Sequence, residues 1–328
     1  MNLFWKRIAN TGKFEQEIAN RHALYHAFVR TEKSALLDEY KELSGIDFKK
    51  AKKEFKKKAD YEQSSMYEKE LRFKELNQDR DILNYLKFEK RNAFTFNGQF
   101  KQVAFEEFSG NKLDTNRWVN AYRWSHAHIK GNYSNANEFQ AYTEGDNTEV
   151  IDGQLHIITK RKDAEGRVWD KDKGFITKPF QYTSDLISGN TFSTEKGSVL
   201  IKFKLQGAHK PLHHFIRAYN DDNQRCITLM ESLSKRKFIV GRTQRNGKDK
   251  LFNTITGLNL EKDFHILQLE WNTEVVTWRI NGTLIHQDSR VDDMTAMHLT
   301  IGSYLSGSKG AEGKIIIDYI RTYNERKD

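Results

Sequence analysis

The amino-acid texture of the chain changes near residue 95, and this change constrains the fold more than any other feature. Beyond it, short runs that alternate apolar and polar side chains follow one another, separated by Gly, Asn and Asp; examples are 199–205 and 265–271. Asn281-Gly282 lies between two such runs and is a strong hairpin signal. Many strands at close spacing without helical interruptions predict a β-sandwich or barrel. We therefore expect residues 96–328 to form a mainly β, antiparallel domain.

Residues 1–95 have a different character. They contain no proline and little β-branched content, and charged residues and helix formers dominate. Apolar side chains recur at helical spacing, for example Phe14, Ile18, Tyr25 and Val29. The sequence predicts a highly charged N-terminal helical segment, with two or three helices that pack on each other and on the β domain.

The formal charge of +9 is uneven, because seven lysines gather between residues 49 and 58. Such a run is typical of a solvated helix face, and the alternative is a docking surface for an acidic partner or a phosphate-rich membrane. No basic stretch is interleaved with aromatic residues and no reading motif occurs, so we do not expect a nucleic-acid partner. The sequence identifies no protein partner for the helical segment.

Cys226 is the single cysteine, so no disulfide can form within the chain and no sign of an oxidising compartment is present. No apolar run is long enough to span a bilayer, and no apolar signal-peptide segment follows Met1–Phe14. The expectation is that the protein stays inside the cell, or that a signal was removed before this chain was defined.

Several pieces of the second part follow one another in a recognisable order. They are Phe105–Gly110, Leu113-Asp114, Trp118, Glu138–Thr143, Asp152–Leu155, Tyr182–Ile187, Phe264-His265, Glu270-Trp271 and Ile317–Tyr323. Together they resemble glycoside hydrolase family 16, the group with laminarinases, lichenases, agarases and carrageenases. The resemblance implies a two-sheet antiparallel jelly roll of the concanavalin A-like kind with a concave face.

The same resemblance bears on catalysis. The family carries its catalytic groups on one strand with the pattern Glu-Ile-Asp-Ile-Met-Glu, in which a bulge at the Met brings the last Glu to the same face as the others. The matching stretch here is Cys226–Glu231. Glu231 occupies the acid/base position, Cys226 the nucleophile position and Thr228 the assisting position. Retaining glycosidases need two carboxyl groups about 5–5.5 Å apart, so the resemblance implies impaired catalysis.

Other positions also depart from the family. Asp185 stands where the family usually has glycine, and Leu200 and Ile216 are expected at cleft positions that hold a Glu and a stacking Trp in the family. Asp221 and Asp222 could supply a substitute acid, but their string reads as a turn.

The expected substrate-binding residues are polar or aromatic side chains of the cleft: Glu138, Trp124, Tyr142, Trp169 and His214. The charged insertion from Lys160 to Phe175 could overhang the cleft as a lid. A metal site is an alternative for five histidines, but no Cys or acidic partner completes a site with them at standard ligand spacing. These histidines are His126, His128, His209, His213 and His214. Asp318 matches the family position of a structural Ca²⁺, the only cofactor that the sequence suggests; the alternative is a strand-end hydrogen bond.

Three functions stay open from the sequence. The favoured one is recognition of a β-linked polysaccharide or oligosaccharide by a catalytically impaired domain. The second is an active glycoside hydrolase on β-glucan or β-galactan, with Glu231 as the general acid/base. The third is a structural or protein-interaction platform in which the helices are the working part.

Overall fold

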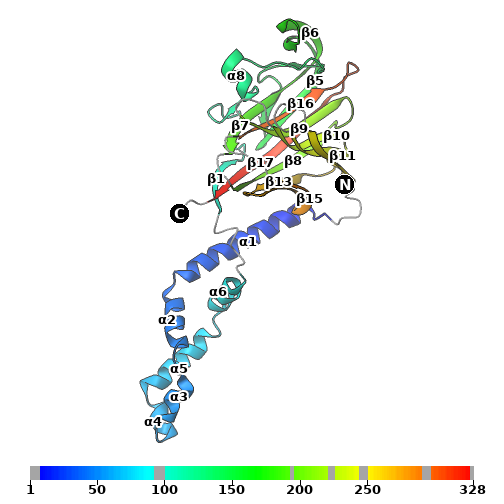
Figure 1. The fold of residues 1–328 in the computed structure, drawn as a ribbon. Helices are drawn as coiled ribbons and strands as arrows, with labels where there is room; N and C mark the ends of the chain where they lie inside the picture. Colours follow the sequence, from blue (N-terminus) through cyan, green and yellow to red (C-terminus); the bar gives the residue numbers. More distant parts are fainter. Residues whose placement is uncertain are drawn as a thin grey trace. The chain divides into compact units, whose positions relative to one another are not determined.

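The computed structural model describes residues 8–91, 100–192, 196–220, 226–243, 250–289 and 297–325. The chain divides into two compact units (Figure 1). One comprises Met1–Phe14 with Phe100–Asp328, and the other comprises Glu15–Gln99. The first fourteen residues therefore group with the β domain rather than with the helices. None of the helices in the described ranges is long and apolar enough to cross a membrane.

The described residues of the β unit form seventeen strands. They are β1 Phe100–Glu106, β2 Trp118–Val119, β3 Ala141–Tyr142, β4 Thr148–Ile151, β5 Gln154–Asp170, β6 Gly174–Ser184, β7 Leu186–Phe192, β8 Gly197–Gln206, β9 Leu212–Asn220, β10 Cys226–Ser234, β11 Lys237–Thr243, β12 Lys250–Thr256, β13 His265–Trp271, β14 Val275–Ile280, β15 Thr283–Ser289, β16 Met297–Leu305 and β17 Gly313–Glu325. The short helix α8, Arg123–Ile129, lies between β2 and β3.

The strands form two sheets. The first has seven strands in the order β12-β11-β10-β9-β16-β7-β2, and the second has ten, with the path β15-β14-β13-β8-β17-β5-β6-β3 and β1 and β4 at its side. Every paired strand is antiparallel except β3, which pairs parallel to β6. The predicted antiparallel sandwich with an N-terminal helical segment is confirmed.

One large hydrophobic core joins the inner faces of both sheets. Ile216 and Ala218 of β9 meet the alternating apolar residues of β8 in this core, and Trp118, Trp271 and Trp278 are almost completely buried. Burying a large apolar side chain contributes roughly 1.5–3 kcal/mol, so period-two alternation fixes which face of each strand turns inward. The Trp278 indole N–H also donates to the Thr228 carbonyl at 3.1 Å, which ties the ten-stranded sheet to β10.

The helical unit has a separate small core. Its helices are α1 Thr11–Glu32, which begins in the β unit, α2 Ala35–Ser44, α3 Phe48–Lys53, α4 Lys58–Glu62, α5 Ser65–Leu76 and α6 Arg80–Lys90. Buried Leu37, Leu43, Leu76, Ile82 and Tyr85 form the core. The sequence predicts two or three helices before residue 95, and residues 8–91 hold six. Side-chain caps at Ser34, Asp47, Ser64 and Asp79 start new helices there.

Candidate functional site

A β-bulge in β10 decides which residues reach the outer face of the seven-stranded sheet. Thr228 pairs with Arg217 of β9, but Met230 pairs with the very next residue, Ile216. Leu229 and Met230 therefore both enter the core, and Glu231 emerges on the same outer face as Cys226 and Thr228. This is the bulge that the family resemblance implies.

Arg217 is the central residue of this face, and the sequence analysis did not identify it. Its Nη2 donates to Glu231 Oε2 at 2.5 Å, and its Nη1 donates to the Tyr219 hydroxyl at 3.1 Å. The guanidinium lies over the Phe215 ring, 4.5 Å from the ring centre. The sequence could have indicated Arg217, because it is a charged residue within a strand whose other positions are mostly buried.

Glu231 is held as a carboxylate. Tyr304 donates to its Oε1 at 2.7 Å, while Arg217 pairs with the other oxygen. Burial of Glu231 acts to raise its pKa, but the charge of Arg217 and the two hydrogen bonds outweigh burial, so the pKa is lowered. A carboxyl group with a lowered pKa is a poor proton donor at neutral pH.

Cys226 and Thr228 lie beside this ion pair. Burial raises the pKa of the Cys226 thiol against the opposing influence of Arg217, so the thiol stays neutral near pH 7. The hydroxyl of Thr228 lies 4.0 Å from the sulfur. Asp221 and Asp222, the possible substitute acids, lie outside the described residues.

Glu138 belongs to the same polar cluster. The segment that carries it is fastened to the end of β16, since the Leu305 amide donates to the Gln140 side chain at 2.7 Å and Gln140 donates to Glu138 at 3.2 Å. The amide and side chain of Asn135 also donate to Glu138. Burial raises the pKa of Glu138, although these hydrogen bonds and Arg217 act in the opposite direction.

A chain of aromatic rings leads outward from the cluster. Tyr122 meets Tyr219, Tyr142 and Tyr133 at ring-centre distances of 5.9, 6.4 and 5.9 Å. Tyr133 continues to Trp124 of α8 at 6.5 Å and to Phe175 at 5.2 Å. Phe175 then contacts Trp169 at 5.0 Å. Glu138, Trp124, Tyr142 and Trp169, all expected to bind substrate, are thus connected to Glu231. We use the name aromatic face for Glu138 together with the connected rings of this paragraph, which are Tyr219, Tyr122, Tyr142, Tyr133, Trp124, Phe175 and Trp169.

His214 is not part of the aromatic face, contrary to expectation. Its side chain is completely buried, and its two ring nitrogens already bond to Ser303 Oγ at 2.7 Å and to the Gln206 carbonyl at 3.1 Å. Burial lowers the pKa of His214 to about 3. The neighbouring His213 stacks on Tyr304 instead, with ring centres 4.9 Å apart.

Ile216 and Leu200 also lie elsewhere than expected. Ile216 is in the core, while Phe215 and Arg217 on either side of it face outward, so Ile216 does not stand at an exposed cleft position as expected. Leu200 lies on β8 of the ten-stranded sheet, where it pairs with Gln268 and Arg321. Neither residue can contribute to the aromatic face.

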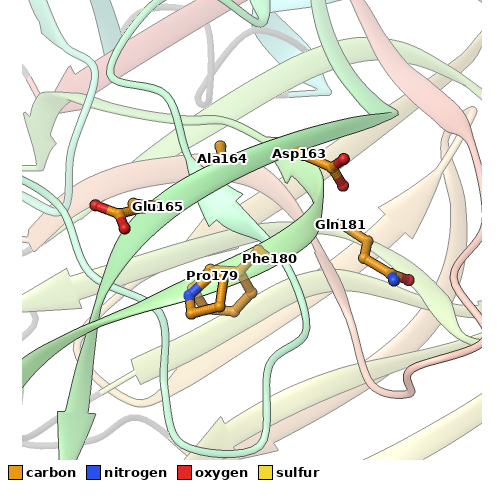
Figure 2. A pocket seen from close by; sticks show the side chains of 6 residues that line it. All are labelled: Asp163, Ala164, Glu165, Pro179, Phe180 and Gln181. Carbon is orange, nitrogen blue, oxygen red and sulfur yellow. The ribbon is translucent and has the colours of Figure 1, made fainter.

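The insertion from Lys160 to Phe175 is not a loop lid but part of a long hairpin. Strands β5 and β6 pair almost to their tip, where Asp170 meets Gly174. A hollow of about 470 Å³ lies on this hairpin where the register shifts near Ala164, and Pro179 and Phe180 are among its lining residues (Figure 2). No residue lining it belongs to the aromatic face.

The residues at Asp318 do not fit a calcium ion. One carboxylate oxygen pairs with the Lys202 ammonium at 2.9 Å, and the other accepts from the Gln154 amide at 3.0 Å. A cation already neutralises this carboxylate, whereas calcium prefers several oxygen ligands at one point. Across the described part of the chain, no three His, Cys, Asp or Glu side chains gather in a metal-binding arrangement.

Asp185 anchors the turn that follows Tyr142. Its buried Oδ2 accepts from the Gly145 amide at 2.7 Å and from the hydroxyls of Thr143 and Thr148 at 3.1 Å. Glu144 of the same turn accepts from the Asn132 amide at 2.7 Å, next to Tyr133. The residue that departs from the family glycine thus supports two tyrosines of the aromatic face.

We expect Asp185 to make stability depend on pH. Burial raises the pKa of Asp185 to about 6, above its value in an unfolded chain. Its stabilising contribution is therefore complete at low pH and is lost as pH rises through 6, by about 2 kcal/mol between pH 4 and pH 6. Chemical denaturation at several pH values measures this, and Asp185→Asn should remove the slope. Parallel pH profiles of the two proteins would contradict the assignment.

Comparison with solved structures places the β unit among known folds. A laminarinase catalytic domain from Thermotoga maritima matches with 20% identity and a TM-score of 0.56, covering 70% of this chain and all of that domain. An endo-β-1,3-glucanase from Pyrococcus furiosus matches with 19% identity and a TM-score of 0.55, covering 70% of this chain and 97% of its own. A non-specific endo-β-1,3(4)-glucanase from family GH16 matches with 18% identity and a TM-score of 0.55, covering 70% and 92%.

These likenesses confirm the predicted jelly roll of the glycoside hydrolase family 16 type. No family model and no curated protein matches the sequence. Sequence identities of 18–20% support a shared fold, and they do not assign the activity of these enzymes to this chain.

Proposed function

We propose that the protein recognises a β-linked glycan at the aromatic face and does not hydrolyse it by the retaining mechanism of family 16. The observation that carries this proposal is the pairing of Arg217 with Glu231 on a face whose nucleophile position is a thiol. The partner is accordingly a polysaccharide or oligosaccharide.

The charge of the site opposes the retaining reaction. Its transition state is oxocarbenium-like, so positive charge develops on the sugar, and two carboxyl groups must flank the bond that breaks. Here the pair consists of Glu231 and the neutral thiol of Cys226, with the Arg217 cation beside both. Glu231 is also ionised, so it lacks the proton that the leaving oxygen needs.

The features needed for recognition are retained. Sugar rings have apolar faces that pack on aromatic side chains, and the half-buried Trp124 and the 46% exposed Trp169 lie at the outer ends of the aromatic face. Tyrosine hydroxyls and the Glu138 carboxyl group provide hydrogen-bonding partners for sugar hydroxyls. The arrangement suits a chain of sugars rather than a small compact ligand.

Calorimetric titration with laminarin, lichenan and galactan tests the proposal, together with a reducing-end assay on each. We expect binding without hydrolysis, and we expect Trp124→Ala and Trp169→Ala each to weaken binding about fivefold. Ile151→Ala, which removes an apolar side chain of similar exposure on the ten-stranded sheet, serves as the matched control. Hydrolysis that disappears in Glu231→Gln would defeat the proposal.

A second candidate is an inverting hydrolase. The pKa of Glu138 is raised and that of Glu231 is lowered, and such opposite shifts are the pattern of a general acid and a general base. These roles reverse the expectation that Glu231 is the acid. An inverting pair stands about 6.5–9.5 Å apart and gives a product of inverted configuration. Proton NMR of the first product, with loss of turnover in both Glu138→Gln and Glu231→Gln, would favour this candidate over the first.

A further inference from the structure

We infer that the glycan bound at the aromatic face is acidic, and that Arg217 contacts a carboxylate or sulfate group on one of its sugars. This inference rests on the proposed function and narrows its substrate class. It follows from the hydrogen-bonding capacity of Arg217, the electrostatics of its neighbours and the charge of helix α8.

Arg217 has more donors than its protein partners use. A guanidinium carries five N–H groups. Within the described ranges one donates to Glu231 and one to Tyr219, which leaves three N–H groups without a hydrogen-bonded acceptor. The side chain is 18% exposed, so a ligand can reach it. The planar guanidinium fork matches the geometry of a carboxylate or sulfate better than that of a lone hydroxyl.

The position of Arg217 is fixed before any ligand arrives. The guanidinium lies over the Phe215 ring, 4.5 Å from its centre, and 5.8 Å from the centre of the Tyr304 ring. A side chain held by two ring contacts and two hydrogen bonds loses little conformational entropy when it binds a further group. This preorganisation is useful for recognition of one defined anionic group.

The ionisable side chains around Arg217 carry little net negative charge that would repel an anionic ligand. Glu231 is already paired with Arg217, and the neutral Cys226 thiol contributes no charge. Burial raises the pKa of Glu138, which favours its protonated form as a negative group approaches. Burial also raises the pKa of Tyr219 and Tyr304, so both keep their hydroxyl protons.

Helix α8 adds positive charge where the glycan would arrive. Between residues 123 and 130 the sequence contains Arg123 and Lys130 but no acidic residue, and both cations are exposed. Trp124, the stacking residue, lies beside Arg123 on this helix. A sugar chain stacked on Trp124 would thus pass a basic helix on its way to Arg217, which favours a negatively charged chain.

The test compares three probes that contain β-linkages by calorimetric titration of the full chain: polymannuronate with carboxylates, ι-carrageenan with sulfates, and neutral laminarin. We expect at least one acidic probe to bind about tenfold or more tightly than laminarin in low salt, and this advantage to shrink as salt increases. The stronger of the two acidic probes identifies the anionic group.

The decisive variant is Arg217→Gln combined with Glu231→Gln, which removes the cation without leaving a buried carboxylate unpaired. The ratio of acidic to neutral affinity should fall most of the way to one, with the remainder due to the cations at α8, whereas Lys262→Gln, at an exposed lysine of the same unit, should keep the ratio. Equal affinity of the original protein for all three probes would overturn this inference alone. Binding of none of these probes or of the neutral glycans would overturn the proposed function as well.

Discussion

Replacement of Arg217 by methionine is expected to lower the free energy of unfolding by about 4 kcal/mol. The substitution preserves most of the apolar contact with Phe215 but leaves the Glu231 carboxylate buried, with Tyr304 as its remaining hydrogen-bond donor. The side chains of the pair are only 18% and 10% exposed, so water replaces the lost cation only in part. Urea denaturation followed by circular dichroism measures the change.

Two further variants separate the unpaired charge from the loss of packing. Arg217→Met combined with Glu231→Gln removes both charges and keeps an acceptor for Tyr304, so it should recover more than half of the loss. Arg279→Met breaks the more exposed pair with Glu270 on the ten-stranded sheet and should cost less than about 1 kcal/mol. If the double variant is as unstable as Arg217→Met, the ion pair does not explain the effect.

The fold could be predicted because its signals are local. Alternation in 199–205 and 265–271 gave strands β8 and β13, and Asn281-Gly282 lies at the turn between β14 and β15 as expected. The bulge before Glu231 was expected from the family pattern that Cys226–Glu231 resembles, and the register of β10 with β9 shifts there. These patterns depend on neighbouring residues and on burial of one face, so they survive without knowledge of the partners.

The site was harder to predict because its contacts join distant strands. Glu231 meets Arg217 fourteen positions earlier and Tyr304 seventy-three positions later. The sequence of one strand does not determine which other strand will lie beside it. Leu200 illustrates the point, because its strand was correctly anticipated but belongs to the other sheet.

A shift of one residue explains why Ile216 and His214 were expected on the outer face and why Arg217 was overlooked. In a strand, neighbouring side chains point to opposite faces, so placing Ile216 on the outer face also placed Arg217 in the core and hid it from consideration. The same shift led to the expectation that His214 faces outward, although its side chain is buried. At Asp318 the sequence offered a carboxylate at the right place, but it could not show that Lys202 would neutralise it.

Residues 8–11 are hydrogen-bonded to the β unit and pack against its core. The Asn281 side chain donates to the Ala9 carbonyl at 2.9 Å and to Thr11 Oγ1 at 3.1 Å, and it accepts from the Ile266 amide at 2.7 Å. Thr11 in turn donates to the Phe264 carbonyl, and Ile8 packs against the core. This short segment therefore anchors the chain to the turn between β14 and β15.

Asn281→Ala should lower the free energy of unfolding by about 3 kcal/mol, because it leaves buried hydrogen-bonding groups unpaired and places a Cβ-bearing residue without a side-chain amide at φ 45°. Asn281→Gly tolerates that backbone angle, so the difference between the two variants measures strain, and the remainder measures the anchor. A chain that begins at residue 15 should lose more stability than Asn281→Gly, because the core packing of Ile8 and the hydrogen bond from Thr11 to Phe264 are removed as well. Adding Asn281→Gly to that chain should cost only the remaining hydrogen bond from the Ile266 amide, which is less than Asn281→Gly costs in the full chain. Additive losses would mean that Asn281 acts independently of the anchor.

A truncation at residue 95 removes the anchoring segment of the β unit along with the helices. Loss of glycan binding in such a truncation would therefore not assign the binding to the helical unit.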